Sequence, residues 1–439
     1  KQASVLVGAG SIGQAIILLG IIIAITAIVL AVLAHPAFGT FRHVSKERLM
    51  SSPNWRNGMF QNQEPTPQFT GDTGSHTTLW RFLTAKDPMR VPAEPVPAVK
   101  TNLQALSTNH DWLVWFGHSS YLFCLGGKRV LVDPVLQLEY PSSLMLKPFA
   151  GTDIYRPDDL PEIDVLIITH EHWDHMDYAT LRDIRPKVKE VVCPLGIADY
   201  LRYWHYDPEH IHEMDWYDNV PLPAFNLQLT CLPARHFSNR LLRKRNQTLW
   251  ASFLIDDGHR KVYVGGDGGY GQHFREIYDR FGSVDLAFLE NGQYNDNWRY
   301  IHTTPDNLEK VVLDLQPKQF FTVHHNKFAL AMHPWQQPDS VAHALAAKLS
   351  PSSPSPSPSP SPSSSPSPSS SPSPSPSQAK PDPLSSIIPV RPHRPLSAAR
   401  LCLGLRLAVV LMYSASITAE GGHTFGDPDT GREFFAGIF

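Results

Sequence analysis

The residues with the clearest chemical potential stand together in the sequence HEHWDH, at residues 170–175. Four of these six side chains are types that bind metal ions: His170, His172, Asp174 and His175. They directly follow residues 163–169, an isoleucine-, valine- and leucine-rich run that is typical of a buried strand. A tight loop after such a strand can direct alternate side chains toward two adjacent ions. Imidazole and carboxylate groups are ligands that zinc accepts. A lone histidine is more often an ordinary surface or core residue, but this spacing predicts a metal site.

The HxHxDH pattern after an apolar strand resembles the metallo-β-lactamase superfamily. The resemblance implies a four-layer αββα sandwich, an α/β fold, with two Zn²⁺ ions per chain. It also implies further ligands in a fixed order, each at the end of a strand. In that order, His170, His172 and His236 hold one ion, Asp174, His175 and His324 hold the second, and Asp267 bridges the two.

The last ligand has a rival, because His325 stands beside His324. Strand alternation directs the two side chains to opposite sides, so only one of them can reach the site. The segment that ends in Phe-Ala-Leu at residues 328–330 resembles a family segment in which the residue at position 324 is the ligand.

Other motifs resemble a narrower group, the N-acyl-phosphatidylethanolamine-hydrolysing phospholipases D and their bacterial relatives. The similarity covers roughly residues 80–335. One departure from the family pattern is Gly268, where relatives commonly carry a small hydroxyl residue. The matching segments are WFGHS at 115–119, LVDP at 131–134, CPLG at 193–196, residues 282–286, ENGQY at 290–294, and Ile-His at 301–302.

This resemblance implies a zinc phosphodiesterase of phospholipase D type acting on N-acyl phosphatidylethanolamine-like phospholipids. A hydroxide shared by the two ions would attack phosphorus, and Asp267 would orient it and move its proton. Asp133 is a candidate partner for a ligand histidine, with a plain Asp-Pro turn as the equal alternative. His302 is a candidate catalytic residue that approaches the substrate phosphate or the leaving group, and His118 is a candidate for contact with the substrate or with a ligand. A surface position is the competing interpretation for each of these histidines.

Two other functions compete with the phosphodiesterase. The first is hydrolysis of another bond, as in a lactonase or other esterase, because a two-metal hydroxide can also attack a carbonyl carbon. The second is a non-catalytic membrane scaffold with a structural metal, although seven ligands exceed the closed four-ligand site that such a metal requires. A flavodiiron oxidoreductase is disfavoured, because that branch is typified by an HxE pattern, with glutamate where this sequence has His172.

Short β-rich runs alternate with helical stretches between residues 111 and 348, which predicts a layered α/β domain of about 240 residues. Thr304 and Pro305 predict the start of a helix that continues to Leu315. The predicted strands cover residues 111–116, 121–125, 129–132, 163–169, 190–193, 225–232, 250–255, 261–265, 284–289 and 319–323.

Residues 15–34 are twenty residues without a charge, long enough for a transmembrane helix or signal-anchor. A cleaved signal peptide and a buried helix are the alternatives. Arg42, Lys46 and Arg48 follow the run and favour a cytoplasmic catalytic domain on a single-pass anchor at the membrane. The GxGxxG pattern at residues 8–13 lacks a following βαβ unit and an acidic residue about 20 positions on, so no nicotinamide cofactor is expected.

The remaining composition excludes other classes. The formal net charge is −3, so there is no electrostatic footprint for nucleic acid. The four cysteines are widely spaced, which excludes a thiolate zinc finger. The predicted organisation is an N-terminal segment (1–41), a connecting region (42–110), the catalytic domain (111–349), a Ser/Pro linker (350–377) and a tail without an assigned role (378–439).

Overall fold

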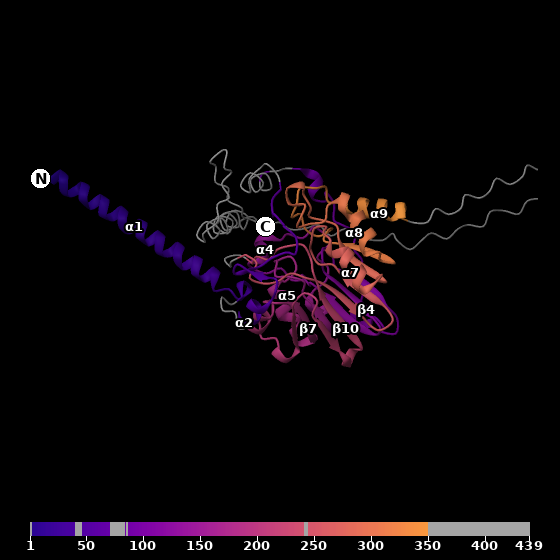
Figure 1. Cartoon of the computed structure of the whole chain (residues 1–439). Coiled ribbons are helices and arrows are strands. Elements are labelled where there is room, and N and C mark those ends of the chain that lie inside the picture. The colour runs from indigo at the N-terminus through magenta and orange to yellow at the C-terminus, as the bar shows by residue number, and fades with distance from the viewer. Residues whose placement is uncertain (1, 40–45, 71–83, 85–86, 241–244, 350–439) are drawn as a thin grey trace, which may run out of the picture.

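The computed structural model of the chain describes residues 2–39, 46–70, 84, 87–240 and 245–349. The predicted linker, the tail and Cys402 lie outside the described residues. Within them, two six-stranded sheets form the body of the domain, and Figure 1 shows helices on its outside.

The first sheet has the strand order β3-β4-β5-β6-β7-β8. Strands β3 to β5 pair antiparallel, and β5 to β8 pair parallel. Strand β4 has the predicted bounds, and β8 was not predicted. The strands are β3 (Trp112–Trp115), β4 (Tyr121–Leu125), β5 (Lys128–Val132), β6 (Ile163–Ile167), β7 (Val188–Pro194) and β8 (Ile211–Met214).

The second sheet has the order β14-β13-β12-β11-β10-β9. Strands β12, β13 and β14 pair parallel, and the other neighbours pair antiparallel. Strand β14 matches its prediction, and β9 was missed. The strands are β9 (Asn219–Leu222), β10 (Leu227–Leu232), β11 (Ser252–Asp256), β12 (Lys261–Val264), β13 (Leu286–Glu290) and β14 (Gln319–Val323).

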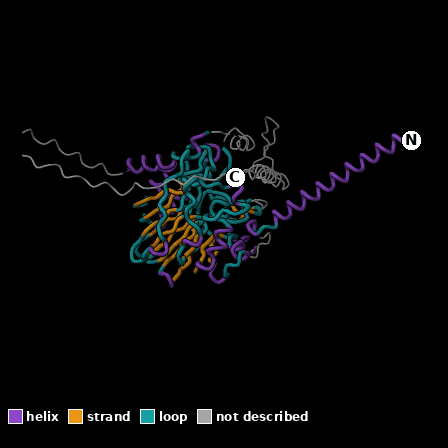
Figure 2. The backbone as a smooth tube through the Cα atoms, turned by 180° about the vertical axis from the view of Figure 1, so that it is seen from behind, coloured by secondary structure: helices purple, strands orange, loops and turns teal. Residues whose placement is uncertain are grey.

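Helices pack on the outer face of each sheet. Figure 2 shows the strands gathered in the domain, with one long helix extending away from it. Helix α8 begins after Thr304 with a proline in its first turn, as predicted. The helices are α1 (Gln2–Leu33), α2 (Lys46–Ser51), α4 (Ser142–Met145), α5 (Tyr178–Ile184), α6 (Ala198–Tyr203), α7 (His273–Phe281), α8 (Pro305–Leu315) and α9 (Gln337–Leu349).

Side-chain alternation along the strands explains the four layers. In β4, Tyr121 and Phe123 point into the core between the sheets, where they meet Phe288 of β13, while Leu122 points outward to the core under α5 and α6. The second sheet likewise turns Leu289 outward, against α7 and α8. The four-layer α/β sandwich expected from the sequence is therefore the fold.

Residues 46–70, which the sequence assigned to a connecting region, pack into the domain. Strands β1 (Trp55–Arg56) and β2 (Met59–Phe60) form a small hairpin. Leu49 and Phe60 are buried in the core between the two sheets. This segment therefore contributes to the body of the domain before the first strand of the main sheets begins.

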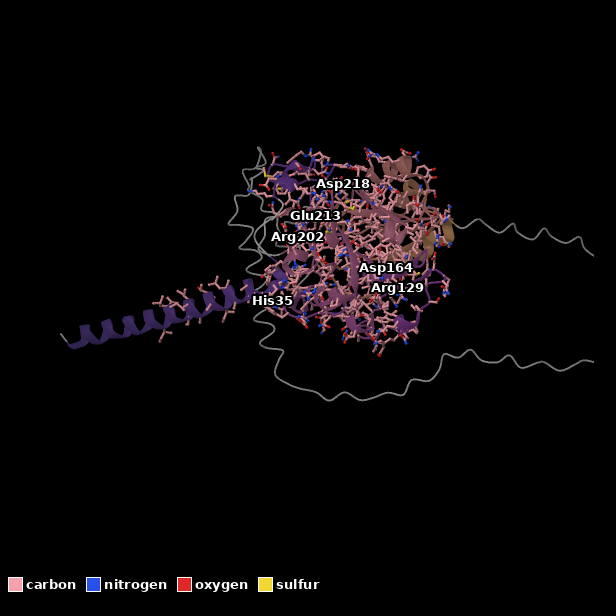
Figure 3. The ribbon with its side chains drawn as sticks, turned by 90° about the horizontal axis from the view of Figure 1, so that it is seen from below. His35, Arg129, Asp164, Arg202, Glu213 and Asp218 are labelled. Atoms are coloured by element: carbon pink, nitrogen blue, oxygen red, sulfur yellow. The ribbon has the colours of Figure 1, made fainter. Side chains whose placement is uncertain are left out.

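Helix α1 extends away from the domain, and Figure 3 labels His35 where the helix meets it. Large apolar side chains on this helix, such as Ile17 and Leu30, are more than half exposed. Among the described residues, no helix satisfies the joint length and hydropathy requirements for crossing a membrane. The predicted transmembrane helix over residues 15–34 is thus not confirmed.

Replacing Phe288 by alanine should destabilise the domain by about 3–5 kcal/mol, because a cavity would open where Phe288 stacks on Tyr121 between the sheets. Urea unfolding measures the loss. The control is Leu313→Ala on α8, where the side chain is 53% exposed and the expected change is within about 0.5 kcal/mol. Equal effects for the two substitutions would contradict this account of the core.

Candidate metal centre

The candidate site lies along one edge of the two sheets, where several strands end. Asp133 follows β5, His170 follows β6 and Asp267 follows β12, while Glu290 ends β13 and His324 follows β14. The carboxyl ends of parallel strands meet at the same edge of a sheet, so loops far apart in sequence converge there. The fold thereby brings together all seven ligands that the resemblance implies.

The first group contains His170, His172 and His236, together with Asp267. The His172 Nδ1 atom lies 2.9 Å from Nε2 of His170 and 3.2 Å from Nε2 of His236. The Asp267 Oδ2 atom lies 3.8 Å from each of those Nε2 atoms. Ligand atoms that share a tetrahedral ion at about 2.1 Å lie roughly 3.4 Å apart, so this group has the dimensions of a metal site.

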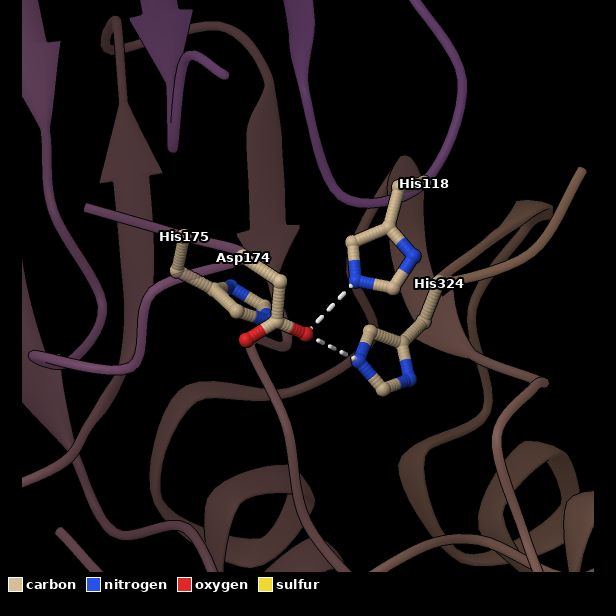
Figure 4. Close-up of side chains that lie close together, drawn as sticks. All are labelled: His118, Asp174, His175 and His324. Carbon is tan, nitrogen blue, oxygen red and sulfur yellow. Dashed lines mark hydrogen bonds and ion pairs between the residues drawn. The ribbon is translucent and has the colours of Figure 1, made fainter. Parts of the chain in front are cut away.

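The second group, shown in Figure 4, contains Asp174, His175 and His324, and His118 lies in the same cluster. The Asp174 Oδ2 atom lies 3.7 Å from Nε2 of His175 and 3.5 Å from Nε2 of His324. Asp267 reaches this group as well, with its Oδ1 3.2 Å from His175 Nε2 and its Oδ2 3.0 Å from His324 Nε2. Among the described residues, Asp267 is therefore the carboxylate with close contacts to both groups.

The structure separates His324 from its neighbour His325. His324 has a left-handed backbone, with φ of 73°, and its ring lies in the cluster. The His325 ring packs beside Trp115, and its Nε2 lies 3.2 Å from the carbonyl oxygen of Thr322. Only His324 is placed to bind an ion with the other ligands.

Four of the cluster's histidines have their outward ring nitrogen beside an oxygen atom. Such a partner fixes the ring orientation and the tautomer of a metal-binding histidine. The pairs of Nδ1 and oxygen are His170 with Thr169 Oγ1 (3.0 Å), His175 with Asp133 Oδ2 (2.8 Å), His236 with the Ile301 carbonyl (2.7 Å) and His324 with Glu290 Oε1 (3.1 Å).

Asp133 does more than form a turn before Pro134. Besides His175, it accepts hydrogen bonds from the backbone amide of Thr169 at 2.8 Å and from its hydroxyl at 2.6 Å. The side chain is fully buried, and the backbone has a positive φ of 40°. Asp133 thus ties the end of β6 to a histidine of the second group.

Burial and charge divide the histidines of the cluster into two kinds. Burial lowers the pKa of His236 to about 3 and holds the pKa values of His170 and His172 well below their usual range. Burial opposes a charge on His175 too, but the Asp267 and Asp174 carboxylates outweigh it and raise its pKa to about 10. The same balance, led by Asp267, raises the pKa of His324.

The donor set fits divalent ions. Asp267 Oδ1, His175 Nε2 and His324 Nε2 are buried, and among the described residues they form ion pairs within the cluster but no hydrogen bond. Buried polar atoms are nearly always paired, so three converging exceptions indicate that an ion completes their coordination. The cluster is a candidate site for divalent metals.

The two other predicted histidines lie beside the ligands. His118 is fully buried, and its Nε2 lies 2.8 Å from Asp174 Oδ2 (Figure 4). The His302 ring stacks on His324 at 5.4 Å, and its Nδ1 makes a short contact with Glu290. The sequence named both histidines as candidates, but it did not give these partners, because the partners come from other segments of the chain.

Two residues that hold candidate ligands in place were not predicted from the sequence. Glu290 contacts His302 and His324 and accepts hydrogen bonds from the amides of Gly268 and Thr303 at 2.8 and 3.1 Å. Its position in the ENGQY segment was the available signal.

Asn62 is the second such residue. Its Nδ2 donates to the His236 carbonyl at 2.7 Å, and its Oδ1 accepts from the His236 amide at 3.1 Å. These two hydrogen bonds hold the backbone of a candidate ligand. Asn62 lies in a segment with no metal-binding pattern, so the local sequence gave no signal for this role.

Comparisons with known proteins show what the chain is similar to. Residues 128–325 match the family described as "Beta-lactamase superfamily domain". An uncharacterized protein of Mycobacterium tuberculosis is 35% identical over 304 residues, which cover 67% of this chain and 80% of that protein. Outer membrane protein RomA of Klebsiella pneumoniae is 53% identical over 98 residues, which cover 22% of this chain and 74% of RomA.

A relative with a named activity is N-acyl-phosphatidylethanolamine-hydrolyzing phospholipase D 1 of Caenorhabditis elegans. It is 27% identical over 232 residues, 49% of this chain and 64% of the nematode protein. Among solved structures, CmlA, a diiron beta-hydroxylase from Streptomyces venezuelae, is similar with a TM-score of 0.43 and 21% identity, covering 54% of this chain and 51% of CmlA.

Replacing Asp133 by asparagine should weaken metal binding about 10- to 100-fold, because His175 loses its charged orienting partner. Metal content after dialysis against a chelator measures the effect. The matched control is Asp164→Asn, a buried aspartate on β6 that accepts from the Arg129 amide and pairs with Lys189. Wild-type metal retention in the Asp133 variant would contradict the orienting role.

Metal binding should release about two protons at pH 7, one each from His175 and His324, because their raised pKa values keep them protonated in the metal-free protein. Binding at His170, His172 and His236 should release almost none, since their lowered pKa values keep them neutral. Affinity of the second group should therefore fall as the pH falls. Calorimetric titration in buffers of different ionisation enthalpy counts the protons, and a count near zero would refute the assignment.

Proposed function

The chain belongs to the beta-lactamase superfamily and is a metal-dependent hydrolase of that fold, and within this class we propose that it is a phosphodiesterase of phospholipase D type. The proposed substrates are N-acyl phosphatidylethanolamine-like phospholipids. The observation that carries the proposal is the position of Asp267, whose carboxylate lies within 3.8 Å of ring nitrogens in both ligand groups. The activity named for the nematode relative supports the choice of bond and of lipid.

We propose zinc as the metal, with two ions per chain. His170, His172 and His236 would hold one ion, Asp174, His175 and His324 the other, and Asp267 both. Ions bound there would supply a nucleophile from water at neutral pH and offset negative charge on the phosphate oxygens. Imidazole and carboxylate ligands with the measured spacing suit zinc.

The chain's own groups orient the reaction and handle its protons. Asp267 is buried and lies close to both ligand groups, which supports the proposal that it orients the attacking water and accepts a proton from it. His302 keeps Nδ1 against Glu290, which leaves Nε2 for the phosphate or the leaving oxygen of the substrate. The His302 side chain is 14% exposed, so substrate has access to it.

Contact with a lipid surface is part of the proposal. The exposed apolar side chains of α1 would be satisfied at such a surface, and the phospholipid substrate resides there. The membrane association named for RomA is compatible with this placement. The catalytic domain would then lie beside that lipid surface, and we propose the cytoplasmic surface, which Arg42, Lys46 and Arg48 favour.

The test uses the full-length protein loaded with zinc and vesicles that contain N-acyl phosphatidylethanolamine. Mass spectrometry should detect release of N-acylethanolamine and phosphatidate, and Asp267→Asn should reduce the rate at least about 100-fold, because it removes the carboxylate shared by both ligand groups. Asp164→Asn is the control for a buried aspartate away from the site.

A parallel assay with lactones separates the two hydrolase hypotheses. Turnover of lactones without cleavage of the phospholipid would overturn the proposed substrate class. Retention of wild-type lipid cleavage by Asp267→Asn would overturn the proposed centre.

A further inference from the structure

One arginine connects the back of the candidate metal loop, residues 170–175, to the N-terminal segment of the chain. Arg240 follows the His236 loop, and its side chain has no exposed surface. Its Nη1 donates to the Glu171 carbonyl at 2.8 Å, and its Nε donates to the Ala37 carbonyl at 2.9 Å. The guanidinium also lies 3.8 Å from the centre of the Trp173 ring.

The residues that Arg240 contacts alternate with the candidate ligands. His170, His172 and Asp174 face the cluster, whereas Glu171 and Trp173 stand between them in the sequence and contact Arg240. The Glu171 carboxylate in turn accepts a hydrogen bond of 2.6 Å from the hydroxyl of Tyr200. The metal loop therefore has one side for the ions and one side held by Arg240 and α6.

Residues 36–39 of the N-terminal segment pack closely against α6 and the metal loop. Residues Pro36–Phe38 form a short 3₁₀ helix, and Trp204 donates to the Pro36 carbonyl at 2.9 Å. Phe38 is 2% exposed, and its ring meets Trp173 edge to face at 5.3 Å. At Gly39, a Cβ atom would lie 2.2 Å from the Tyr200 ring, so the chain passes without room for a side chain.

Arginine suits this position better than lysine. Its guanidinium is planar, so it can stack on an indole ring and donate in its own plane to two carbonyl groups at once. A lysine ammonium is a point charge and reproduces neither the stacking nor the fixed directions of the two donors.

We propose that Arg240 is a positioning residue that fastens Pro36–Phe38 to the back of the metal loop, which makes this N-terminal segment a structural component of the metal centre. The inference rests on the proposed metal site and is independent of the proposed lipid substrate. It gives the segment directly after α1 a role in holding the ligands. This role is separate from the proposed contact of α1 with a lipid surface.

The test compares Arg240→Lys and Phe38→Ala in the full-length protein. The control for Arg240→Lys is Arg280→Lys, the same substitution at a guanidinium that lies 4.0 Å from the Tyr217 ring. The control for Phe38→Ala is Leu30→Ala, at an exposed residue of α1. The two readouts are metal retained after dialysis against a chelator and hydrogen exchange of the amides at residues 170–175 in the metal-free protein. Neither readout requires a substrate.

Arg240→Lys and Phe38→Ala should each lose metal about 10-fold more readily, and their loop amides should exchange about 10-fold faster, while both controls match the wild type. Phe38→Ala leaves the buried charge in place, so it tests the idea even if Arg240→Lys does not fold. Wild-type metal retention and loop protection in folded Phe38→Ala would overturn the proposal. Absence of lipid cleavage by a protein that passes both tests would overturn only the proposed function.

Discussion

Asp267 is 3% exposed and lies 3.2 and 3.0 Å from the nearest ring nitrogens of His175 and His324. A buried carboxylate without compensation is costly, and here the compensation comes from charged imidazoles that the carboxylate itself stabilises. Burial raises the pKa of Asp267, but His175 and His324 outweigh it and hold the pKa well below its usual range. Divalent ions can take over this compensation, so the same charge balance prepares the cluster for metal.

That balance depends on the sandwich. Asp267 follows β12 of one sheet and His175 belongs to the loop after β6 of the other, so the two meet only when the sheets pack. The core formed by Tyr121, Phe123 and Phe288 sets the spacing between the sheets. Around the cluster, Asp133, Glu290 and the Ile301 carbonyl fix ring orientations from three different segments of the chain. Packing, polar contacts and candidate chemistry are thus parts of one arrangement.

The sequence predicted the parts of this arrangement that have local signals. The HEHWDH loop follows an apolar strand, and β4, β14 and α8 lie close to the predicted ranges. It could not predict Asn62 on the His236 backbone or Arg240 behind Trp173, because both are contacts between segments more than 60 residues apart. The choice between His324 and His325 depended on a left-handed backbone turn that strand alternation does not describe.

The position of Asp267 between the two ligand groups implies that one carboxylate would contact two metal ions. Anomalous diffraction from crystals of the protein grown with zinc can locate these ions. We expect two peaks about 3.5–4 Å apart, one beside His170, His172 and His236 and one beside Asp174, His175 and His324, with Asp267 within ligand distance of both. A single ion in a closed four-ligand site, with Asp267 outside its coordination, would show that the carboxylate is not shared.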